Sequence, residues 1–486
     1  MRNSLADLEP ARLWKHFLAL AKIPRGSGNE AAAAQYCADA ARAMGHEVSR
    51  DPVGSVVVRK KGAPGRENAP GLVLQAHVDM VCEKNEETAH DFLHDPIDIY
   101  RDGDLLAARG TTLGADNGIG VAAALAILES TEIKHGPLEV LFTVDEETGL
   151  TGASGFPGGV LRGRYFINLD SEEEGVLTIG CAGGIDTVVT RALTLQGPSP
   201  AASAYRLKLC GLKGGHSGVD INRGRANAIS LLARVLHGLM PRFDLELAAI
   251  DGGNKRNAIP REAFALILAD PGHEKHLSAA VAACERELLS AFGAFDPGLA
   301  LVMEPATAPA RVIAPPDALA IVRFLFAAPH GVVAMSPDME GLVQTSVNLG
   351  VVATKEDRFE AVFLSRSSID SCKTSLAARI AALAGLAGME CAHSGGYPGW
   401  KPDPGTTLVK MVTALYGRMY AKPMKVEAMH AGLECGIIGE KYPGMEMVSI
   451  GPSMWDVHTP DEKVSISSSA RFLDLLQAIV ESDFPG

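Results

Sequence analysis

Three potential metal ligands follow predicted strands within one to three residues in the sequence. This placement constrains the fold more strongly than any other feature of the chain. Short apolar runs predict buried strands at 72–75, 138–144 and 165–169. The ligand-type residues that follow them are His77, Glu147 and Asp170. Another apolar run, 119–128, predicts a buried helix, and strands alternating with helices favour an α/β sheet. Because ligands of such sheets bind beyond the carboxyl ends of the strands, we expect one pocket to collect these three side chains.

Two further residues of the same chemical type lie in short signatures of their own. Asp116 lies in GADNG, and His458 lies in WDVHTP. Two imidazoles and three carboxylates could hold two divalent cations with one carboxylate as a bridge, and such a pair of ions makes hydroxide at neutral pH and polarises a carbonyl. Taken singly, Asp116 could instead cap a helix and His458 could be a loop histidine. Together, the five residues favour a hydrolase.

Two carboxylates beside these residues are candidates for supporting roles. Asp79 is two residues after His77, so both side chains point the same way on a strand, and Asp79 can fix the imidazole tautomer. Glu146 precedes Glu147 at the end of an apolar strand, where adjacent buried carboxylates are costly unless they are paired or bind metal. One of the two can be a ligand while the other stays free as a general base. A solvated acidic loop remains the alternative, because Asp145 adds a third charge.

Composition limits the other function classes. A chain of 486 residues should form at least two domains. With 45 Lys plus Arg against 58 Asp plus Glu, the net charge of −13 argues against a nucleic-acid or anionic-membrane partner. We expect no signal peptide and no membrane-spanning helix, because no sufficiently long apolar run is present. Eight cysteines without a CxxC pair indicate reduced thiols and a cytoplasmic protein.

The middle of the chain has a different character. Strands are predicted at 204–209, 263–268, 342–352 and 359–365, and helices at 226–239, 274–292 and 373–386. None of these segments carries a cluster of metal-ligand residues. We therefore predict an α/β catalytic domain from 1–184 and 398–486, with a separate domain of α+β type, 185–397, inserted into it.

Five segments taken together resemble the signatures of the co-catalytic zinc metallopeptidases, the family of glutamate carboxypeptidase, aminoacylase and aminotripeptidase. They are AHVDMVCEKN, GTTLGADNGIG, DEETGLTGA, NLDSEEEG and WDVHTPDE. The resemblance runs nearly end to end and is nearest to the bacterial dipeptidases of that family. It implies a doubly wound, mixed-sheet catalytic domain, an inserted lid domain, and two zinc ions. The implied ligands are His77 and Asp170 for one ion, Glu147 and His458 for the other, and Asp116 as the bridge.

The same resemblance assigns five further roles. Asp79 would orient His77, and Glu146 would be the general base. In the lid, His216 of GGHSG would hold the substrate carbonyl or oxyanion. Asn257 of NAIP and Arg366 of LSRSS would contact the C-terminal carboxylate of the substrate, a task that suits the bidentate guanidinium. Without the resemblance, GGHSG could be a glycine-rich turn and Arg366 could form a surface ion pair.

The resemblance finally implies an activity and a set of partners. We expect a cytoplasmic homodimer that hydrolyses small peptides, namely Xaa-His and other Xaa-Xaa dipeptides. The expected metal is zinc, with cobalt or manganese as alternatives. An aminotripeptidase or an N-acyl amino acid hydrolase with the same metal site is the nearest alternative. A catalytically inactive binding protein would lack a ligand or Glu146, and all of these are present. The Asp116–Asn117 peptide bond is expected to be cis.

Overall fold

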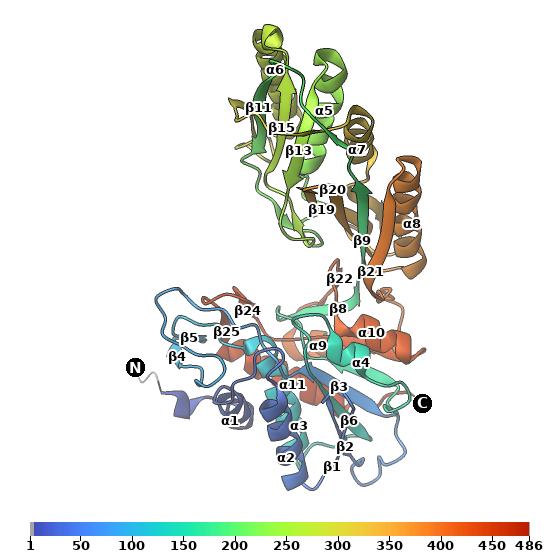
Figure 1. The fold of residues 1–486 in the computed structure, drawn as a ribbon. Helices are drawn as coiled ribbons and strands as arrows, with labels where there is room; N and C mark the ends of the chain where they lie inside the picture. The colour runs from blue at the N-terminus through green and yellow to red at the C-terminus, as the bar shows by residue number, and fades with distance from the viewer. Residues whose placement is uncertain (1–3, 486) are drawn as a thin grey trace. The chain divides into compact units, whose positions relative to one another are not determined.

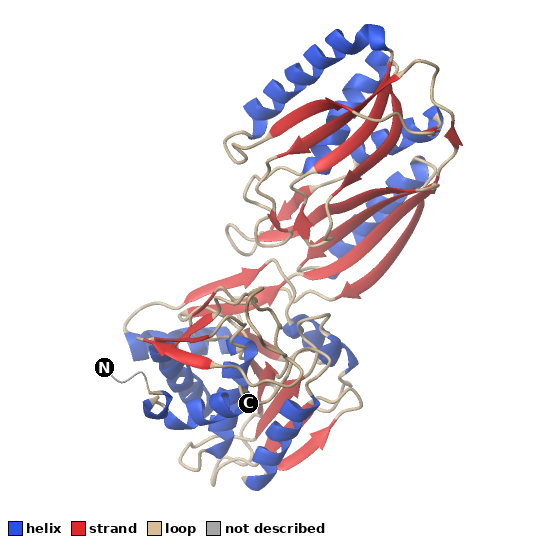
Figure 2. Cartoon of the chain, turned by 60° about the vertical axis from the view of Figure 1, so that its left-hand side comes forward, coloured by secondary structure: helices blue, strands red, loops and turns tan. Residues whose placement is uncertain are grey.

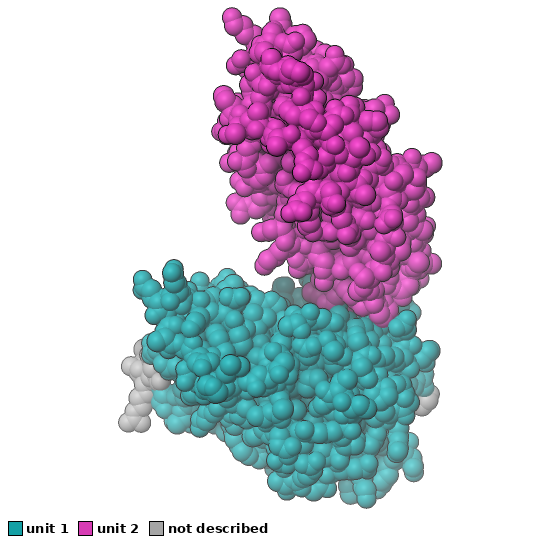
Figure 3. All heavy atoms as spheres, in the orientation of Figure 1, with its two compact units in different colours: residues 1–180, 402–428, 433–486 teal, residues 181–401, 429–432 magenta. Residues whose placement is uncertain are grey.

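Strands from both ends of the chain associate in one eight-stranded sheet. The computed structural model describes residues 4–485 and consists of two units. The first comprises 1–180, 402–428 and 433–486, and the second comprises 181–401 and 429–432 (Figure 3). The metal-ligand residues predicted from the sequence all belong to the first unit, and the three predicted lid residues belong to the second.

The sheet of the first unit is mixed, as predicted. Its strand order is β1 (Glu47–Arg50), β2 (Val56–Lys60), β6 (Leu138–Thr143), β3 (Leu72–His77), β7 (Tyr165–Asn168), β23 (Glu446–Ser449), β8 (Val176–Cys181) and β22 (Lys425–Met429). Strand β3 runs parallel to β6 and β7, and all residues of these three strands are buried. The carboxyl ends of three central strands therefore meet at one edge.

Helices surround this sheet (Figure 1). They are α1 (Ala11–Leu20), α2 (Ala31–Ala43), α3 (Ala115–Glu129), α4 (Thr151–Gly155), α9 (Thr407–Tyr420), α10 (Glu434–Lys441) and α11 (Ile466–Glu481). Helix α3 packs on β3 and contacts α1, so it is buried along its length, as its uninterrupted apolar sequence predicts. A smaller sheet of β24 (Met454–Trp455), β25 (Lys463–Ser465), β5 (Leu105–Ala108) and β4 (Ile99–Asp102) carries the His458 loop between its first two strands.

The second unit is built on an antiparallel sheet of nine strands. Its main path is β16 (Ala300–Pro305), β11 (Ser203–Cys210), β15 (Ala263–Ala269), β13 (Glu246–Gly252), β19 (Val343–Lys355), β20 (Arg358–Ser367), β9 (Gly183–Ala192) and β21 (Glu390–Tyr397), and β18 (Gly331–Met335) pairs with β19. The helices packed on this sheet are α5 (Ala228–Phe243), α6 (Glu274–Phe292), α7 (Pro315–Ala327) and α8 (Asp370–Leu386) (Figure 2). One large apolar core joins these helices to the sheet.

Three short segments, 181–184, 398–401 and 429–432, belong to the second unit and so depart from the boundaries expected from the sequence. Residues 429–432 group with the second unit, although the sequence assigned 398–486 to the first. The reason is hydrogen bonding: His430 Nε2 lies 2.7 Å from Ser346 Oγ, and the Ala431 carbonyl accepts from Ala182 N at 2.9 Å. Among the described residues, no helix is long and apolar enough to cross a membrane.

Candidate metal and substrate sites

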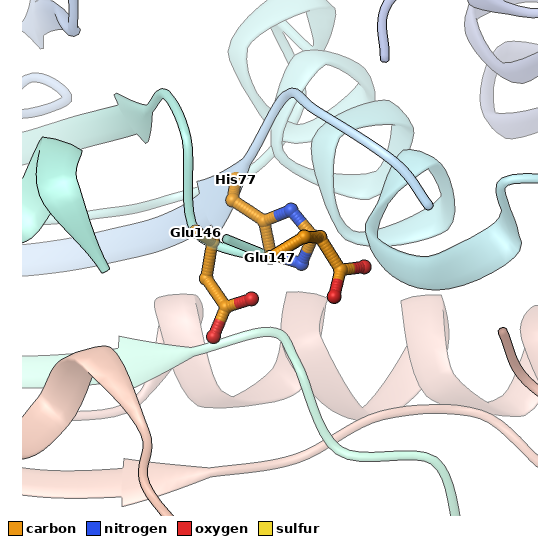
Figure 4. Close-up of side chains that lie close together, drawn as sticks. All are labelled: His77, Glu146 and Glu147. Atoms are coloured by element: carbon orange, nitrogen blue, oxygen red, sulfur yellow. The ribbon is translucent and has the colours of Figure 1, made fainter. Parts of the chain in front are cut away.

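The predicted metal ligands gather where β3, β6 and β7 end. His77 is the last residue of β3, Glu147 follows β6, and Asp170 follows β7. Asp116 lies in the first turn of α3, and His458 lies in the loop between β24 and β25. Each of three groups of these side chains, with Glu146 in one of them, brings its ligand atoms within 4.8 Å of one another. Figure 4 shows the group of His77, Glu146 and Glu147.

Asp116 lies between the two imidazoles. Its Oδ1 is 3.1 Å from His77 Nε2, and its Oδ2 is 3.1 Å from His458 Nε2. Asp170 Oδ1 lies 3.2 Å from His77 Nε2, and Glu147 Oε2 lies 3.1 Å from His458 Nε2. Two half-sites of one histidine and one outer carboxylate therefore share a single carboxylate. The Asp116–Asn117 peptide bond is cis, as expected.

The carboxylates of this group of metal-ligand residues stabilise positive charge on its two histidines. Hydrogen bonds with Asp116 and Glu147 raise the pKa of His458 to about 11. Burial opposes a charge on His77, yet Asp170, Asp116 and Asp79 together raise its pKa well above the ordinary value. The Oε1 atom of Glu147 is buried and has no hydrogen-bond partner within residues 4–485. A carboxylate oxygen in that position is suited to a cation.

Asp79 connects the histidine ligand to the loop of the two glutamates. Its Oδ1 lies 3.2 Å from His77 Nδ1, and its carboxylate accepts the backbone N–H groups of Glu146 and Glu147 at 3.1 Å each. Ser27 Oγ donates a fourth contact at 2.8 Å. Burial would raise the pKa of Asp79, but His77 and these donors hold it at about 2. Asp79 is therefore an ionised carboxylate that can fix the orientation of His77 and the position of the glutamates.

Glu146 has the environment of a proton acceptor. Burial raises its pKa well above the ordinary range; His77 lowers it, but the carboxylates of Asp170, Glu434 and Glu147 add to the increase. A glutamate whose pKa is raised in this way accepts a proton more readily near neutral pH. In the structure it lies beside Glu147, so the two adjacent glutamates can take different roles.

His216 presents one defined ring nitrogen as a donor. It belongs to the short strand β12 (Gly215–His216), and its Nδ1 accepts the backbone N–H groups of Gly218 and Val219 at 3.2 and 3.3 Å. An Nδ1 that accepts must be unprotonated, so the proton of the neutral ring is on Nε2. Burial and the nearby Arg366 lower the pKa of His216, which favours this neutral form.

Arg366 is a buried cation whose partners are neutral. It lies on β20 and is 5% exposed. Its Nη1 donates to the Tyr397 hydroxyl at 2.9 Å, and its Nε contacts Ser217 Oγ at 3.4 Å. The Asn257 carbonyl accepts from Ser217 N at 2.8 Å, which places Asn257 next to this group. The second unit therefore brings His216, Asn257 and Arg366 into one neighbourhood, linked through the segment 216–218.

Several members of these sites were not expected from the sequence. In the first unit they are Glu462, whose carboxylate lies at the start of α3, and Glu434, which is fully buried beside Gln75 and Thr143. In the second unit they are Ser217, Tyr397 and His430. Glu462 belongs to the WDVHTPDE segment already singled out, so its position offered a signal. The segment that contains Tyr397 offered none.

The chain is similar to known peptidases over nearly its whole length. The model of peptidase family M20/M25/M40 matches residues 73–482. The cytosol non-specific dipeptidase of Escherichia coli is 41% identical over 479 residues, which are 99% of each chain. The crystal structure of aminoacylhistidine dipeptidase from Vibrio alginolyticus is 43% identical, covers 99% of both chains and has a TM-score of 0.93. Aminopeptidase PepT from Bacillus cereus shares the fold at 15% identity, with a TM-score of 0.58 over 98% of both chains.

Proposed function

Since the chain belongs to peptidase family M20/M25/M40, we propose that it is a metal-dependent dipeptidase that hydrolyses Xaa-His and other Xaa-Xaa dipeptides. Two relatives that match 99% of this chain are a cytosol non-specific dipeptidase and an aminoacylhistidine dipeptidase. The observation in this chain that carries the proposal is the position of Asp116 between His77 and His458.

The side chains fit two divalent cations. We assign His77 and Asp170 to one ion, Glu147 and His458 to the other, and one oxygen of Asp116 to each. The unpartnered Glu147 oxygen and the raised pKa of His458 support this assignment. Imidazoles mixed with carboxylates suit zinc, and they also accept cobalt or manganese. When bound, two such ions would acidify a water molecule and polarise the scissile carbonyl.

Protein side chains would move the proton and stabilise the developing charge. Glu146 accepts the proton of the attacking water and then delivers it to the leaving amine. Asp79 keeps His77 oriented through its Nδ1. Neutral His216, with its proton on Nε2, donates to the oxyanion of the tetrahedral intermediate.

Arg366 and Asn257 would recognise the far end of the substrate. A free C-terminal carboxylate needs a charge-assisted partner once it is buried, and Arg366 is a buried guanidinium. Such a clamp favours short peptides with a free C-terminus, and we propose that it measures the substrate from that end.

We also infer a homodimer in the cytoplasm. Strand β18 pairs with β19 alone among the described strands, and it exposes Val332, Val333 and Met335 to between 38% and 47%. An unpaired strand edge with exposed apolar side chains suits association with a second copy. The cytoplasmic assignment follows the name of the Escherichia coli relative. Light scattering should give a dimer, and Val333→Asp should give a monomer with unchanged secondary structure; a monomeric wild type would refute the dimer.

A substrate panel with measured metal content tests the central proposal. Purified protein should contain two divalent ions per chain and should cleave dipeptides faster than tripeptides or N-acyl amino acids. Preference for tripeptides would indicate an aminotripeptidase, and preference for N-acyl amino acids an acyl amino acid hydrolase. Protein that purifies without metal, and that stays inactive when each divalent metal is added, would indicate a binding protein.

The carboxylate clamp has a test of its own. Arg366→Ala should lower kcat/KM for a dipeptide by about tenfold to a hundredfold, because a charge-assisted hydrogen bond contributes roughly 1.5–3 kcal/mol. Hydrolysis of the dipeptide amide, which has no carboxylate, should change far less. Arg206→Ala, an exposed arginine of the same unit, is the matched control. An equal decrease for acid and amide would make Arg366 a structural residue.

A further inference from the structure

The hydroxyl of Tyr397 has one hydrogen-bonding function still available. A tyrosine hydroxyl has one donor proton and two acceptor lone pairs. Arg366 Nη1 donates to the Tyr397 oxygen at 2.9 Å, and a guanidinium cannot accept a proton in return. Within residues 4–485, Arg366 is the one hydrogen-bond partner of this hydroxyl. The O–H proton of Tyr397 is therefore available to an acceptor that binds beside Arg366.

The ring of Tyr397 is held in place. A Cβ atom built on Gly184 would lie 2.7 Å from the Tyr397 ring and hydroxyl, and one on Gly432 would lie 2.9 Å from the ring. The two glycines thus allow the ring to lie directly against the backbone. The Tyr397 carbonyl accepts from Lys373 Nζ, and Lys373, 7% exposed, also donates to Asp370 at 2.6 Å. A hydroxyl fixed in this way loses little entropy when it binds a ligand.

The charges around Arg366 leave the anion position open. Of the described residues, none forms an ion pair with Arg366, and the nearby Asp186 pairs with Arg256 at 3.2 Å. Burial and the charge of Arg366 lower the pKa of His216, and they lower that of His430 to about 3, so both rings are neutral. A buried guanidinium without a counter-charge is costly, and an anionic ligand would offset that cost.

We propose that Tyr397 is a substrate-binding residue whose O–H donates to the C-terminal carboxylate of the substrate, beside the guanidinium of Arg366. This assignment rests on the proposed dipeptidase function and extends it. Tyr397 and Arg366 both present donors, whereas a C-terminal carboxamide has no charge and presents N–H donors of its own. Tyr397 therefore selects free carboxylates over amides.

Tyr397→Phe removes the hydroxyl and keeps the ring. Metal-loaded wild type and variant are assayed with Ala-His and with its C-terminal amide. We expect kcat/KM for Ala-His to fall about tenfold, mainly through a higher KM, and that for the amide to change by less than about twofold. The matched control is Tyr420→Phe, which removes a hydroxyl that donates to the Arg471 carbonyl in the first unit. It should leave the acid-to-amide ratio unchanged, and the same result in Tyr397→Phe would overturn the proposal.

The outcomes separate this inference from the function on which it rests. A wild type that cleaves neither substrate refutes the dipeptidase function and the inference together. A wild type that cleaves Ala-His, with an unchanged ratio in Tyr397→Phe, refutes the role of Tyr397 alone. If Tyr397→Phe does not fold, Gly184→Ala displaces the same hydroxyl by its added Cβ atom. A folded Gly184→Ala protein should show the same decrease in the ratio, and an unchanged ratio there would also overturn the proposal.

Discussion

Glu462 holds the backbone of Asp116 at the start of α3. Its Oε1 accepts the Asp116 N–H at 3.3 Å and the Ala115 N–H at 2.7 Å, while its Oε2 accepts those of Leu113 and Gly114 at 2.7 and 3.0 Å. The residue before the helix, Gly114, offers no side-chain cap. A carboxylate from a distant segment therefore takes the place of the N-cap and complements the helix dipole. The proposed bridging ligand thus depends on a residue 346 positions away.

Glu462→Gln should lower both stability and metal affinity. The amide is neutral and offers one acceptor oxygen instead of two, so all four N–H groups lose a charged partner and two of them lose their acceptor, at a cost of about 2–4 kcal/mol. Asp116 should also become less well fixed. Calorimetry and metal titration measure the two effects, with the exposed neighbour variant Asp461→Asn as control. A wild-type melting temperature in Glu462→Gln would show that these contacts do not stabilise the helix.

Glu146→Gln should retain the metals and lose nearly all turnover. The amide cannot accept a proton, and a general base contributes roughly a hundredfold to ten-thousandfold. Mass spectrometry of bound metal, measured together with kcat, distinguishes this effect from loss of a ligand. Glu147→Gln is the matched comparison, and it should lose one ion. Activity of Glu146→Gln above about a tenth of wild type would exclude the general-base role.

The buried strands could be predicted because their sequences are continuous apolar runs. The runs at 72–75 and 138–144 form β3 and β6, which are buried at every residue. Strands β9 and β21 were not predicted, because neither is a continuous apolar run. Both contain polar or glycine residues, and β21 is largely exposed, so an apolar pattern could not identify them.

The metal-ligand residues could be grouped from the sequence, but the buried residues that surround them could not. Parallel strands bring their carboxyl ends together, so His77 and Asp170 meet even though 93 positions separate them. In the sequence alone, Glu434 cannot be distinguished from an ordinary exposed acidic residue at the start of a helix. Its burial arises only when α10 packs against Gln75 and Thr143, a tertiary contact that no local pattern encodes.

Glu434 should make stability depend on pH. It is fully buried, and burial is the main cause that raises its pKa from 4.5 to about 7. A carboxyl with a raised folded-state pKa stabilises the protein fully below about pH 4.5, and that contribution is lost as the pH rises to about 7. The loss amounts to roughly 3 kcal/mol.

Glu434→Gln should remove this dependence. The difference in melting temperature, variant minus wild type, should increase as the pH rises from about 5 to about 8, because the amide needs no proton to stay neutral. Glu440→Gln, an exposed change on the same helix, should show a constant difference. A constant difference for Glu434→Gln as well would mean that Glu434 titrates alike in the folded and unfolded states.

Removal of the metal should abolish activity and lower the melting temperature. Without cations, the carboxylates of Asp116, Glu147 and Asp170 repel one another in a buried cluster. Ions that bind only the folded state stabilise it by mass action. Asp116→Ala should lose both ions, since it removes a ligand from each half-site. Two tightly bound ions per chain in Asp116→Ala would refute the bridging assignment.

The affinity for the metal should increase with pH. His458 binds a cation only when it is unprotonated, and hydrogen bonds with Asp116 and Glu147 raise its pKa to about 11. A metal ion must therefore displace a proton from His458 near neutral pH, so binding releases protons and strengthens as the pH rises from about 6 to 8. Titration calorimetry of zinc into metal-free protein in buffers of different ionisation enthalpy measures the released protons. Binding without proton release would show that His458 is already neutral or is not a ligand.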